Sequence, residues 1–460
     1  MDRRTFLRSA LVAGGGAAVL PTVAMASPAA GQGSEGPYGA ILGREPDENG
    51  LLLPEGFSGR VVAVAGEPVA ETGYEWPVFP DGAATFDDGE GGWWYAVNSE
   101  VRFPAGQGGA SSIHFDADGE IVEAQQILEG TSGNCAGGPT PWGTWLSCEE
   151  SGPGGQVWEC DPTGAEPAVA RPAMGKWNHE AAAVDPDREQ VYLTEDSPVG
   201  LLYRFTPQAY PDLSAGRLEA AIVADDGSVT WGEVADPSGE SQITAAQVPG
   251  ATIFPGNEGI WYHDGSIVFT SKGDNRVHAM DVEASTYELV YEGDDPLTGV
   301  DNVTVEQGSG DVFVAEDGGN MEVILISTEG DVVPFARITG PGHDDSEITG
   351  PAFNPAGDRM YFSSQRGVTP RTISDIAGVG GETNNGGITY EVTGPFRGLE
   401  ASEDAETASP STTIAAAGSS DGGGDDTNVV PLVAGGAIVV AAGVGGAVWL
   451  RSRRSGDAAT

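Results

Sequence analysis

The sequence predicts an all-β fold, a six-bladed β-propeller with one insertion, followed by a C-terminal transmembrane helix. The propeller is indicated first by a repeat: an alternating apolar segment that ends in polar or acidic residues. This segment occurs six times, at 94–100, 144–150, 191–196, 267–272, 312–317 and 360–365. The second indication is the spacing of about 46 to 50 residues between segments, which is close to the length of one propeller blade. One longer gap of about 76 residues locates the insertion at roughly 207–247.

Turn sequences separate each repeated segment from another strand that precedes it. The turns at 185–187, 263–265, 308–311 and 354–357 are rich in Asp, Pro, Asn and Gly, the residues that β-hairpins require. We therefore expect one hairpin in each blade and a propeller domain over residues 36–398. A β-sandwich whose strands happen to be evenly spaced is the alternative fold.

The composition excludes some classes of function. The chain has 460 residues, with 21 Lys+Arg against 69 Asp+Glu and a formal net charge of −48. Such a charge excludes nucleic acid and anionic lipid as electrostatic partners. Hydrophobic residues at 39% are enough for a core, so the chain as a whole is not disordered. The scarcity of lysine beside so many acids is typical of a halophile protein with a carboxylate-covered surface.

The two ends of the chain indicate export and anchoring. Residues 1–26 carry Arg3-Arg4, an apolar stretch and Ala24-Met25-Ala26, which is the pattern of a twin-arginine signal peptide. Residues 399–428 are a Ser/Thr/Gly/Asp-rich stalk, and 429–450 are an uncharged stretch long enough to span a bilayer. The basic tail at 451–460 would stay in the cytoplasm. We expect a protein exported by the twin-arginine machinery and held on the outer face of the membrane by its C-terminal anchor.

Polar residues recur at both ends of each predicted hairpin. The first strands begin with Asn134-Cys135, His179-Glu180, Asn257-Glu258, Asp301-Asn302 and Glu347-Ile348. Counting 15 residues on from Cys135, Glu180 and Asp301 leads to Glu150, Glu195 and Glu316, and counting 14 on from Glu258 leads to Lys272. The start of a strand and the end of its antiparallel partner lie side by side. If these are the inner strands, all blades direct polar groups into one axial pocket.

So many carboxylates in one pocket require cations. Ca²⁺ binds six to eight oxygen ligands of this kind, and the thiol of Cys135 would suit a softer metal such as iron. A histidine-based zinc site is disfavoured because His179 alone occupies a ring position among five histidines. The alternative is that the acids form only the solvated rim of a halophile protein. Three cysteines leave at least one unpaired, and whether Cys148 and Cys160 pair stays open.

The run 134–150, Asn-Cys-Ala-Gly-Gly-Pro-Thr-Pro-Trp-Gly-Thr-Trp-Leu-Ser-Cys-Glu-Glu, resembles the signature of PhoX-type alkaline phosphatases. The stretches 80–84, 179–186, 191–205 and 363–367 extend the resemblance over roughly 36–398. It implies a propeller that holds two iron and several calcium ions, Fe³⁺ and Ca²⁺, and hydrolyses small-molecule phosphate monoesters outside the cytoplasm.

The resemblance also implies site residues. In that family the cysteine of Asn-Cys binds iron and the acids of Cys-Glu-Glu bind metal. The metal ligands implied here are Cys135, Glu149, Glu150, Glu180, Glu195, Asp196, Glu258, Glu316 and Asp317. Longer members carry an Arg-Pro-Glu motif whose arginine holds the substrate phosphate, whereas this chain has Gly256-Asn257-Glu258. Lys272 and Arg366 are the catalytic candidates that would supply the missing positive charge.

Two other functions are compatible with a calcium-binding propeller. One is a calcium-dependent lactonase or esterase in which His179 acts as the base. The other is a non-catalytic module in which calcium only closes the propeller. Iron together with calcium favours the phosphatase, and calcium alone favours the other two.

Overall fold

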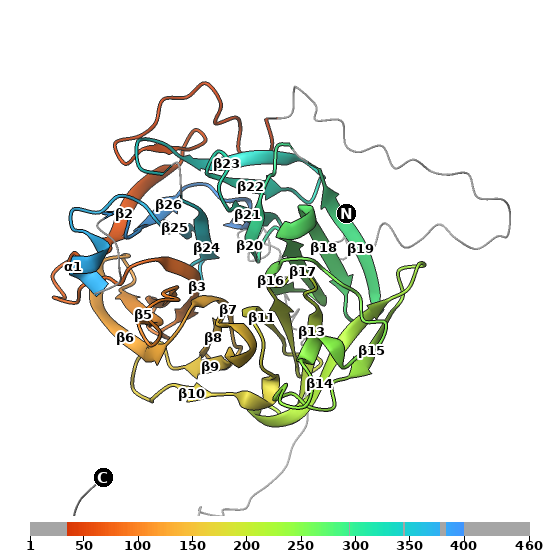
Figure 1. The fold of residues 1–460 in the computed structure, drawn as a ribbon. Coiled ribbons are helices and arrows are strands. Elements are labelled where there is room, and N and C mark those ends of the chain that lie inside the picture. Colours follow the sequence, from red (N-terminus) through yellow and green to blue (C-terminus); the bar gives the residue numbers. More distant parts are fainter. Residues whose placement is uncertain (1–34, 294, 344–345, 378–382, 400–460) are drawn as a thin grey trace, which may run out of the picture. The chain divides into compact units, whose positions relative to one another are not determined.

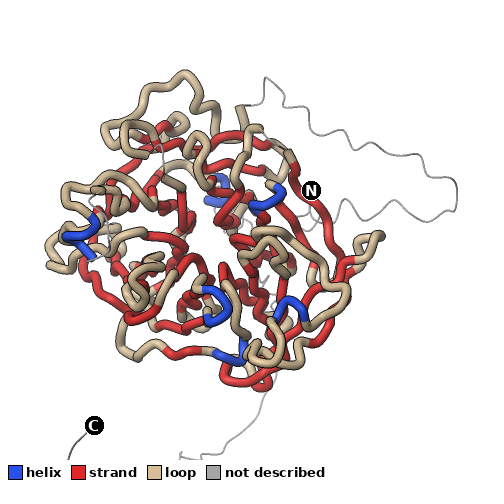
Figure 2. Tube along the Cα trace, in the orientation of Figure 1, coloured by secondary structure: helices blue, strands red, loops and turns tan. Residues whose placement is uncertain are grey.

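A computed structural model describes residues 35–399 apart from 294, 344–345 and 378–382. Six antiparallel sheets of four or five strands are arranged in a ring around a central axis (Figure 1). Figure 2 shows that strands dominate and that the few helices are short. The prediction of an all-β, six-bladed propeller is confirmed, and the β-sandwich alternative is wrong.

Each sheet runs outward from an inner strand. The first two blades are β3 (Pro80–Asp87), β4 (Trp93–Ser99), β5 (Gly108–Phe115) and β6 (Ile121–Thr131), then β7 (Asn134–Pro139), β8 (Trp145–Glu149), β9 (Val157–Cys160) and β10 (Val169–Ala170). The third is β11 (His179–Asp185), β12 (Gln190–Glu195), β13 (Leu202–Ala209), β14 (Asp212–Val223) and β15 (Val229–Glu233). The fourth is β16 (Asn257–His263), β17 (Ser266–Ser271), β18 (Arg276–Asp281) and β19 (Thr286–Glu292).

The last two blades use strands from the start of the chain. The fifth is β20 (Val300–Val305), β21 (Val312–Glu316), β22 (Glu322–Ile326) and β23 (Val332–Ile338), with β1 (Leu51–Leu52) at its edge. The sixth is β24 (Ile348–Phe353), β25 (Arg359–Ser364) and β26 (Ile388–Thr393), with β2 (Ser58–Val64) as its outermost strand. β2 pairs with β26 in the register Ser58↔Thr393, so the N-terminal strand closes the ring.

The six segments found in the sequence are the second strands of the six blades. The insertion begins later than predicted, because the Tyr210-Pro211 turn joins β13 to β14 and does not start a loop. The extra material is β15 and residues 234–256, which include the short 3₁₀ helix Thr244–Ala246. The helix Ile373–Ala377 is the only α-helix of five residues or more that is assigned among the described residues.

Buried apolar side chains fill the space between neighbouring blades. One cluster, for example, joins Leu146 and Val157 of the second blade to Val191 and Phe205 of the third. The inner strands approach each other closely enough to require glycine: a Cβ on Gly138 would lie 1.7 Å from the carbonyl oxygen of Ala182. Close contact between inner strands keeps the axial channel narrow.

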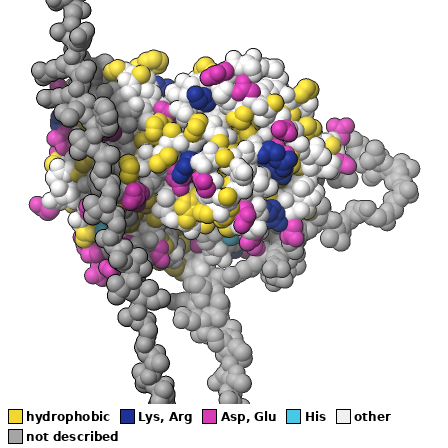
Figure 3. Space-filling view, turned by 90° about the horizontal axis from the view of Figure 1, so that it is seen from below, with side chains coloured by type: hydrophobic (Ala, Val, Ile, Leu, Met, Phe, Trp, Pro, Cys, Tyr) yellow, Lys and Arg dark blue, Asp and Glu magenta, His cyan; other side chains and the backbone are white. Residues whose placement is uncertain are grey.

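Acidic side chains are spread among apolar and basic ones on the side of the propeller seen in Figure 3. The twin-arginine segment 1–26, the stalk 399–428 beyond Leu399, the apolar stretch 429–450 and the tail 451–460 lie outside the described residues. Within the described part of the chain, no helix has the length and apolar character needed to cross a membrane.

Candidate metal centre

The first ring of polar groups comes from the start of the inner strands. In five blades the second residue of the inner strand is an acid or a thiol: Asp81, Cys135, Glu180, Glu258 and Asp301. The pairing register with the second strand shifts directly after the first residue pair in each of these blades. A β-bulge of this kind redirects a side chain away from the alternation of the strand. The five side chains therefore turn toward the axis.

A second ring comes from the residue that directly follows the second strand of each blade. These residues are Glu100, Glu150, Asp196, Lys272, Asp317 and Gln365. The backbone fixes all six in one way, because each N–H donates to a carbonyl of the segment that leads into the inner strand of its own blade. The acceptors, in the same order, are Phe79, Gly133, Asn178, Gly256, Gly299 and Glu347, at 2.7–3.1 Å.

The two rings meet in one continuous cluster. Four groups of three residues each have potential ligand atoms within 4.8 Å of one another: Asp81–Glu100–Cys135, Cys135–Glu150–Glu180, Glu180–Glu258–Asp301 and Asp301–Asp317–Glu347. Neighbouring groups share Cys135, Glu180 and Asp301. The cluster thus contains one thiol and eight carboxyl groups, and it draws on all six blades.

Because the cluster is largely buried, it is unfavourable for all of its carboxyl groups to be ionised at once without a bound cation. Glu180 is fully buried, and neither of its carboxylate oxygens has a hydrogen-bond partner among the described residues. Burial, together with the charges of Glu258 and Asp301, raises the pKa of Glu180 well above its ordinary value. Burial and the carboxylates of Asp81 and Glu180 likewise raise the pKa of the Cys135 thiol. Oxygen and sulfur ligands that converge around a carboxylate without donors, as at Glu180, fit bound cations because a cation removes the repulsion.

Three basic side chains lie around the cluster. Arg102 bridges two acids: its Nε lies 2.6 Å from Glu100 Oε1 and its guanidinium also contacts Glu150. Arg366 lies 3.9 Å from a Glu100 oxygen and is 41% exposed. Lys272 reaches three other carboxylates of the cluster. We had not singled out Arg102 from the sequence, because it lies in a loop outside the repeated segment.

The structure brings five of the nine predicted ligands into the cluster: Cys135, Glu150, Glu180, Glu258 and Asp317. It adds four acids that were not among the predicted ligands, namely Asp81, Glu100, Asp301 and Glu347. All four stand at repeat positions: Asp81 and Asp301 at the bulge, Glu100 after a second strand, and Glu347 just before β24. The repeat alone could have found them.

The structure does not bring Glu149, Glu195 and Glu316 into the cluster. Each is the last residue of a second strand, and it points away from the axis because side chains alternate along a strand. Their carboxylates accept hydrogen bonds within the blades: Glu149 from Trp158 Nε1 at 3.0 Å, Glu195 from the Tyr203 hydroxyl at 2.7 Å, and Glu316 from the Thr298 amide at 2.7 Å.

Asp196 occupies the ring position beside Glu195, although it is outside the four groups of the cluster. It lies next to Glu150, where burial raises the pKa of Glu150 to about 8 and the Asp196 charge adds to the increase. In two blades the count of 15 leads to Glu195 and Glu316, whereas the ring positions are held by Asp196 and Asp317, which are also among the predicted ligands. A fixed count of 15 residues fails there because the hairpins differ in length. The second-ring residue is always the one that directly follows the second strand.

His179 is not placed to act as a base. It is fully buried, its ring stacks on Trp177 with centroids 3.8 Å apart, and its Nε2 lies 3.1 Å from the carbonyl oxygen of Gly175. Burial lowers the pKa of His179 to about 3. Cys148 and Cys160 are free thiols buried within the second blade. Neither contributes to the cluster, and they do not pair.

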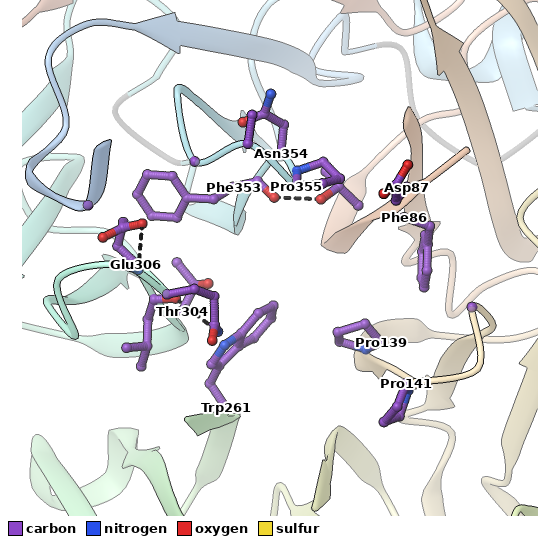
Figure 4. Close-up of a pocket in the computed structure, with 18 of the residues that line it drawn as sticks. Phe86, Asp87, Pro139, Pro141, Trp261, Thr304, Glu306, Phe353, Asn354 and Pro355 are labelled. Atoms are coloured by element: carbon purple, nitrogen blue, oxygen red, sulfur yellow. Dashed lines mark hydrogen bonds between the residues drawn. The ribbon is translucent and has the colours of Figure 1, made fainter. Parts of the chain in front are cut away.

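The opposite end of the axial channel has a different character. There the inner strands end around a pocket of about 770 Å³ lined by residues that include Phe86, Pro139, Trp261, Thr304 and Phe353 (Figure 4). A cavity of only about 20 Å³, lined largely by small residues, lies between this pocket and the cluster end of the same strands. We call the two ends the metal mouth and the aromatic mouth.

Comparison with known proteins identifies related sequences and structures. The family model "Alkaline phosphatase PhoX" matches residues 87–156 and 154–288. The structure of Pseudomonas fluorescens PhoX in complex with vanadate is similar at a TM-score of 0.61 and 17% identity, covering 77% of this chain and 97% of that chain. At this identity the structural similarity establishes the fold, whereas the family match bears on the activity.

More distant propellers are also similar. Regucalcin from Agrobacterium tumefaciens has a TM-score of 0.40 at 15% identity, covering 75% of this chain and 97% of that chain. A gluconolactonase from Xanthomonas campestris has a TM-score of 0.38 at 13% identity, covering 70% and 88%. These two carry no weight for the function. No curated protein matches the chain.

Proposed function

We propose that this chain is a PhoX-type phosphatase that hydrolyses phosphate monoesters at the metal mouth with bound iron and calcium, and the family match at residues 87–156 and 154–288 supports this proposal. The observation that carries the proposal is the convergence of one thiol and eight carboxyl groups from six blades, all but Asp317 buried or half-buried. Such a donor set serves cations, and phosphoryl transfer needs concentrated positive charge.

The ligand types divide the cluster between two kinds of cation. Cys135 supplies the one sulfur and stands in two of the groups, with Asp81 and Glu100 on one side and Glu150 and Glu180 on the other. These groups suit iron, which accepts thiolate together with carboxylate. The two groups built only from carboxylates suit calcium. When bound, the metals would polarise phosphoryl oxygens and lower the pKa of a bound water.

The chain's own residues would bind and orient the substrate. Arg102 and Arg366 lie half-exposed at the edge of the cluster, so their guanidinium groups can donate hydrogen bonds to the oxygens of a phosphate that enters from solvent. Lys272 adds positive charge on the other side of the cluster. The buried Glu180 and Asp81 hold the floor of the site, and the cavity below them measures only about 20 Å³.

Location outside the cytoplasm is part of the proposal. The twin-arginine pattern at 1–26 and the apolar stretch at 429–450 followed by basic residues support export and a C-terminal anchor. Export in the folded state would allow metals to be inserted before the protein crosses the membrane. Fractionation of cells that express the full chain, with and without Arg3→Lys/Arg4→Lys, tests this: the variant should stay in the cytoplasm.

The activity is tested with protein purified without chelator. We expect hydrolysis of p-nitrophenyl phosphate, inhibition by vanadate, and iron and calcium in elemental analysis. Bis-p-nitrophenyl phosphate and a lactone serve as the competing substrates. Hydrolysis of the lactone alone, or calcium without iron and no phosphatase activity, would overturn the proposal.

A further inference from the structure

Lys272 occupies a ring position where four other blades place a carboxylate. The residues in the equivalent position are Glu100, Glu150, Asp196 and Asp317, and Gln365 in the sixth blade. The backbone N–H of Lys272 donates to the carbonyl of Gly256 at 2.7 Å, the same contact that fixes the other five residues. Its Cα is therefore held at the ring whatever its side chain does.

The ammonium group of Lys272 lies among three acids of the cluster. Its Nζ is 3.2 Å from Glu258 Oε1, 3.0 Å from Asp301 Oδ2 and 3.1 Å from Asp317 Oδ2. These acids come from two blades, and Glu258 and Asp301 are buried. An ammonium has three N–H donors. Two of the contacts, to Asp301 and Asp317, are hydrogen bonds and the third, to Glu258, is an ion pair, so the group has the surroundings of a bound cation.

Gln365 shows that the residue at a ring position can donate hydrogen bonds to the acids of the cluster without being able to bind a metal through a carboxylate. Its Nε2 donates to Asp81 Oδ2 at 2.6 Å and to Glu100 Oε2 at 2.9 Å. An amide is neutral, however, and leaves the negative charge of its partners in place. Lys272 differs because it brings a full positive charge to the centre of three carboxylates.

We infer that the Lys272 ammonium is a permanent internal cation that takes the place of one metal ion among Glu258, Asp301 and Asp317. This deepens the proposed function: the part of the two carboxylate-only groups formed by Glu258, Asp301 and Asp317 needs no metal, and calcium would bind on the Glu180 and Glu347 sides of Lys272. It also separates Lys272, which contacts three carboxylates and is 34% exposed, from the more exposed Arg102 and Arg366. Substrate phosphate would then be bound on the arginine side of the cluster.

The inference predicts an additional metal site when the ammonium is removed. Lys272→Met leaves three carboxylates converging on a point about 3 Å from each, and Ca²⁺ requires oxygens at about 2.3–2.6 Å, a small contraction. We expect Lys272→Met and Lys272→Gln to bind one more Ca²⁺ per chain than the wild type. Elemental analysis and calorimetric titration with CaCl₂ measure the number. Lys176→Met is the matched control, since it changes the other lysine of the chain and should leave the count unchanged.

A double variant tests whether the additional ion occupies this position. In an Asp317→Asn background, Lys272→Met should add no calcium, because one of the three ligands is gone. An unchanged calcium count in folded Lys272→Met and Lys272→Gln would overturn the inference. So would unfolding of both variants at every calcium concentration, because a site for calcium would then not exist. The count does not depend on phosphatase activity, so failure of the proposed function would be seen separately in the wild type.

Discussion

The metal mouth and the aromatic mouth are built from the two ends of the same six inner strands. At the metal mouth the strands begin with acids and a thiol that converge, and both carboxylate oxygens of Glu180 lack a hydrogen-bond partner among the described residues. At the aromatic mouth the same strands end at prolines, Trp261 and Phe353 around an open pocket (Figure 4). The larger cavity thus lies at the end opposite the proposed metal centre.

The difference between the two mouths originates in local backbone geometry. At the metal mouth a bulge in each of five inner strands turns one side chain toward the axis, and the residue after the second strand joins it. At the aromatic mouth the hairpin turns line a pocket of about 770 Å³. Cavity size and the buried acidic cluster therefore distinguish different ends of the channel, and the proposed function lies at the end with the acids.

The largest expected effect separates the two mouths directly. Glu180→Gln removes a buried acid that two groups of the cluster share, so we expect phosphatase activity to fall at least about 100-fold, with loss of bound metal. Trp261→Phe at the aromatic mouth is the control and should leave activity within about twofold. Steady-state kinetics and elemental analysis of both variants measure this. An equal loss of phosphatase activity in the two variants would contradict the assignment of the activity to the metal mouth.

A second test concerns how substrate binds at the metal mouth. Arg366→Ala should raise KM for p-nitrophenyl phosphate about 10-fold or more through loss of a charge-assisted hydrogen bond, with a smaller change in kcat and unchanged metal content. The control is Arg217→Ala, which changes an arginine that is 58% exposed on β14. If KM stays constant, the phosphate is not bound by Arg366.

A third test compares two neighbouring residues at the end of β12 and asks which of them contributes to metal binding. Asp196→Asn should weaken metal binding about 10-fold, because the charge beside Glu150 is lost. Glu195→Gln changes the neighbouring residue, which bonds to Tyr203 inside the blade, and should leave metal affinity unchanged. Competition with a chelating indicator gives both affinities. If Glu195→Gln weakened metal binding and Asp196→Asn did not, Glu195 would be the ligand.

The smallest expected effect lies in a blade interior, away from both mouths. Burial lowers the pKa of His278 to about 3, so its neutral form is favoured in the folded state. The stability that this provides is complete above the ordinary pKa of 6.5 and is lost as the pH falls toward 3. Relative to His278→Gln, the wild type should lose about 2 kcal/mol between pH 7.5 and pH 5. Urea unfolding at both pH values measures the difference, and parallel losses would contradict it.

The number of blades could be predicted from the sequence because each blade repeats the same pattern of strands and turns. It also located the metal mouth, since polar residues at both ends of one hairpin must meet. It could not distinguish Glu195 from Asp196, or Glu316 from Asp317, because neighbours on a strand point to opposite sides and the exact register decides which faces the axis. The partners of Lys272 were also beyond sequence reasoning, since Asp301 and Asp317 come from a different blade.

The β2 strand that completes the sixth blade has a consequence for how the protein acquires activity. Residues 58–64 must find β26, more than 300 positions later, before the circle is complete and the ligands of the first and last blades can face each other. No partial product of synthesis or proteolysis that lacks either partner can assemble the entire centre. We therefore expect the enzyme to have no activity until β2 has paired with β26 and the sixth blade is complete.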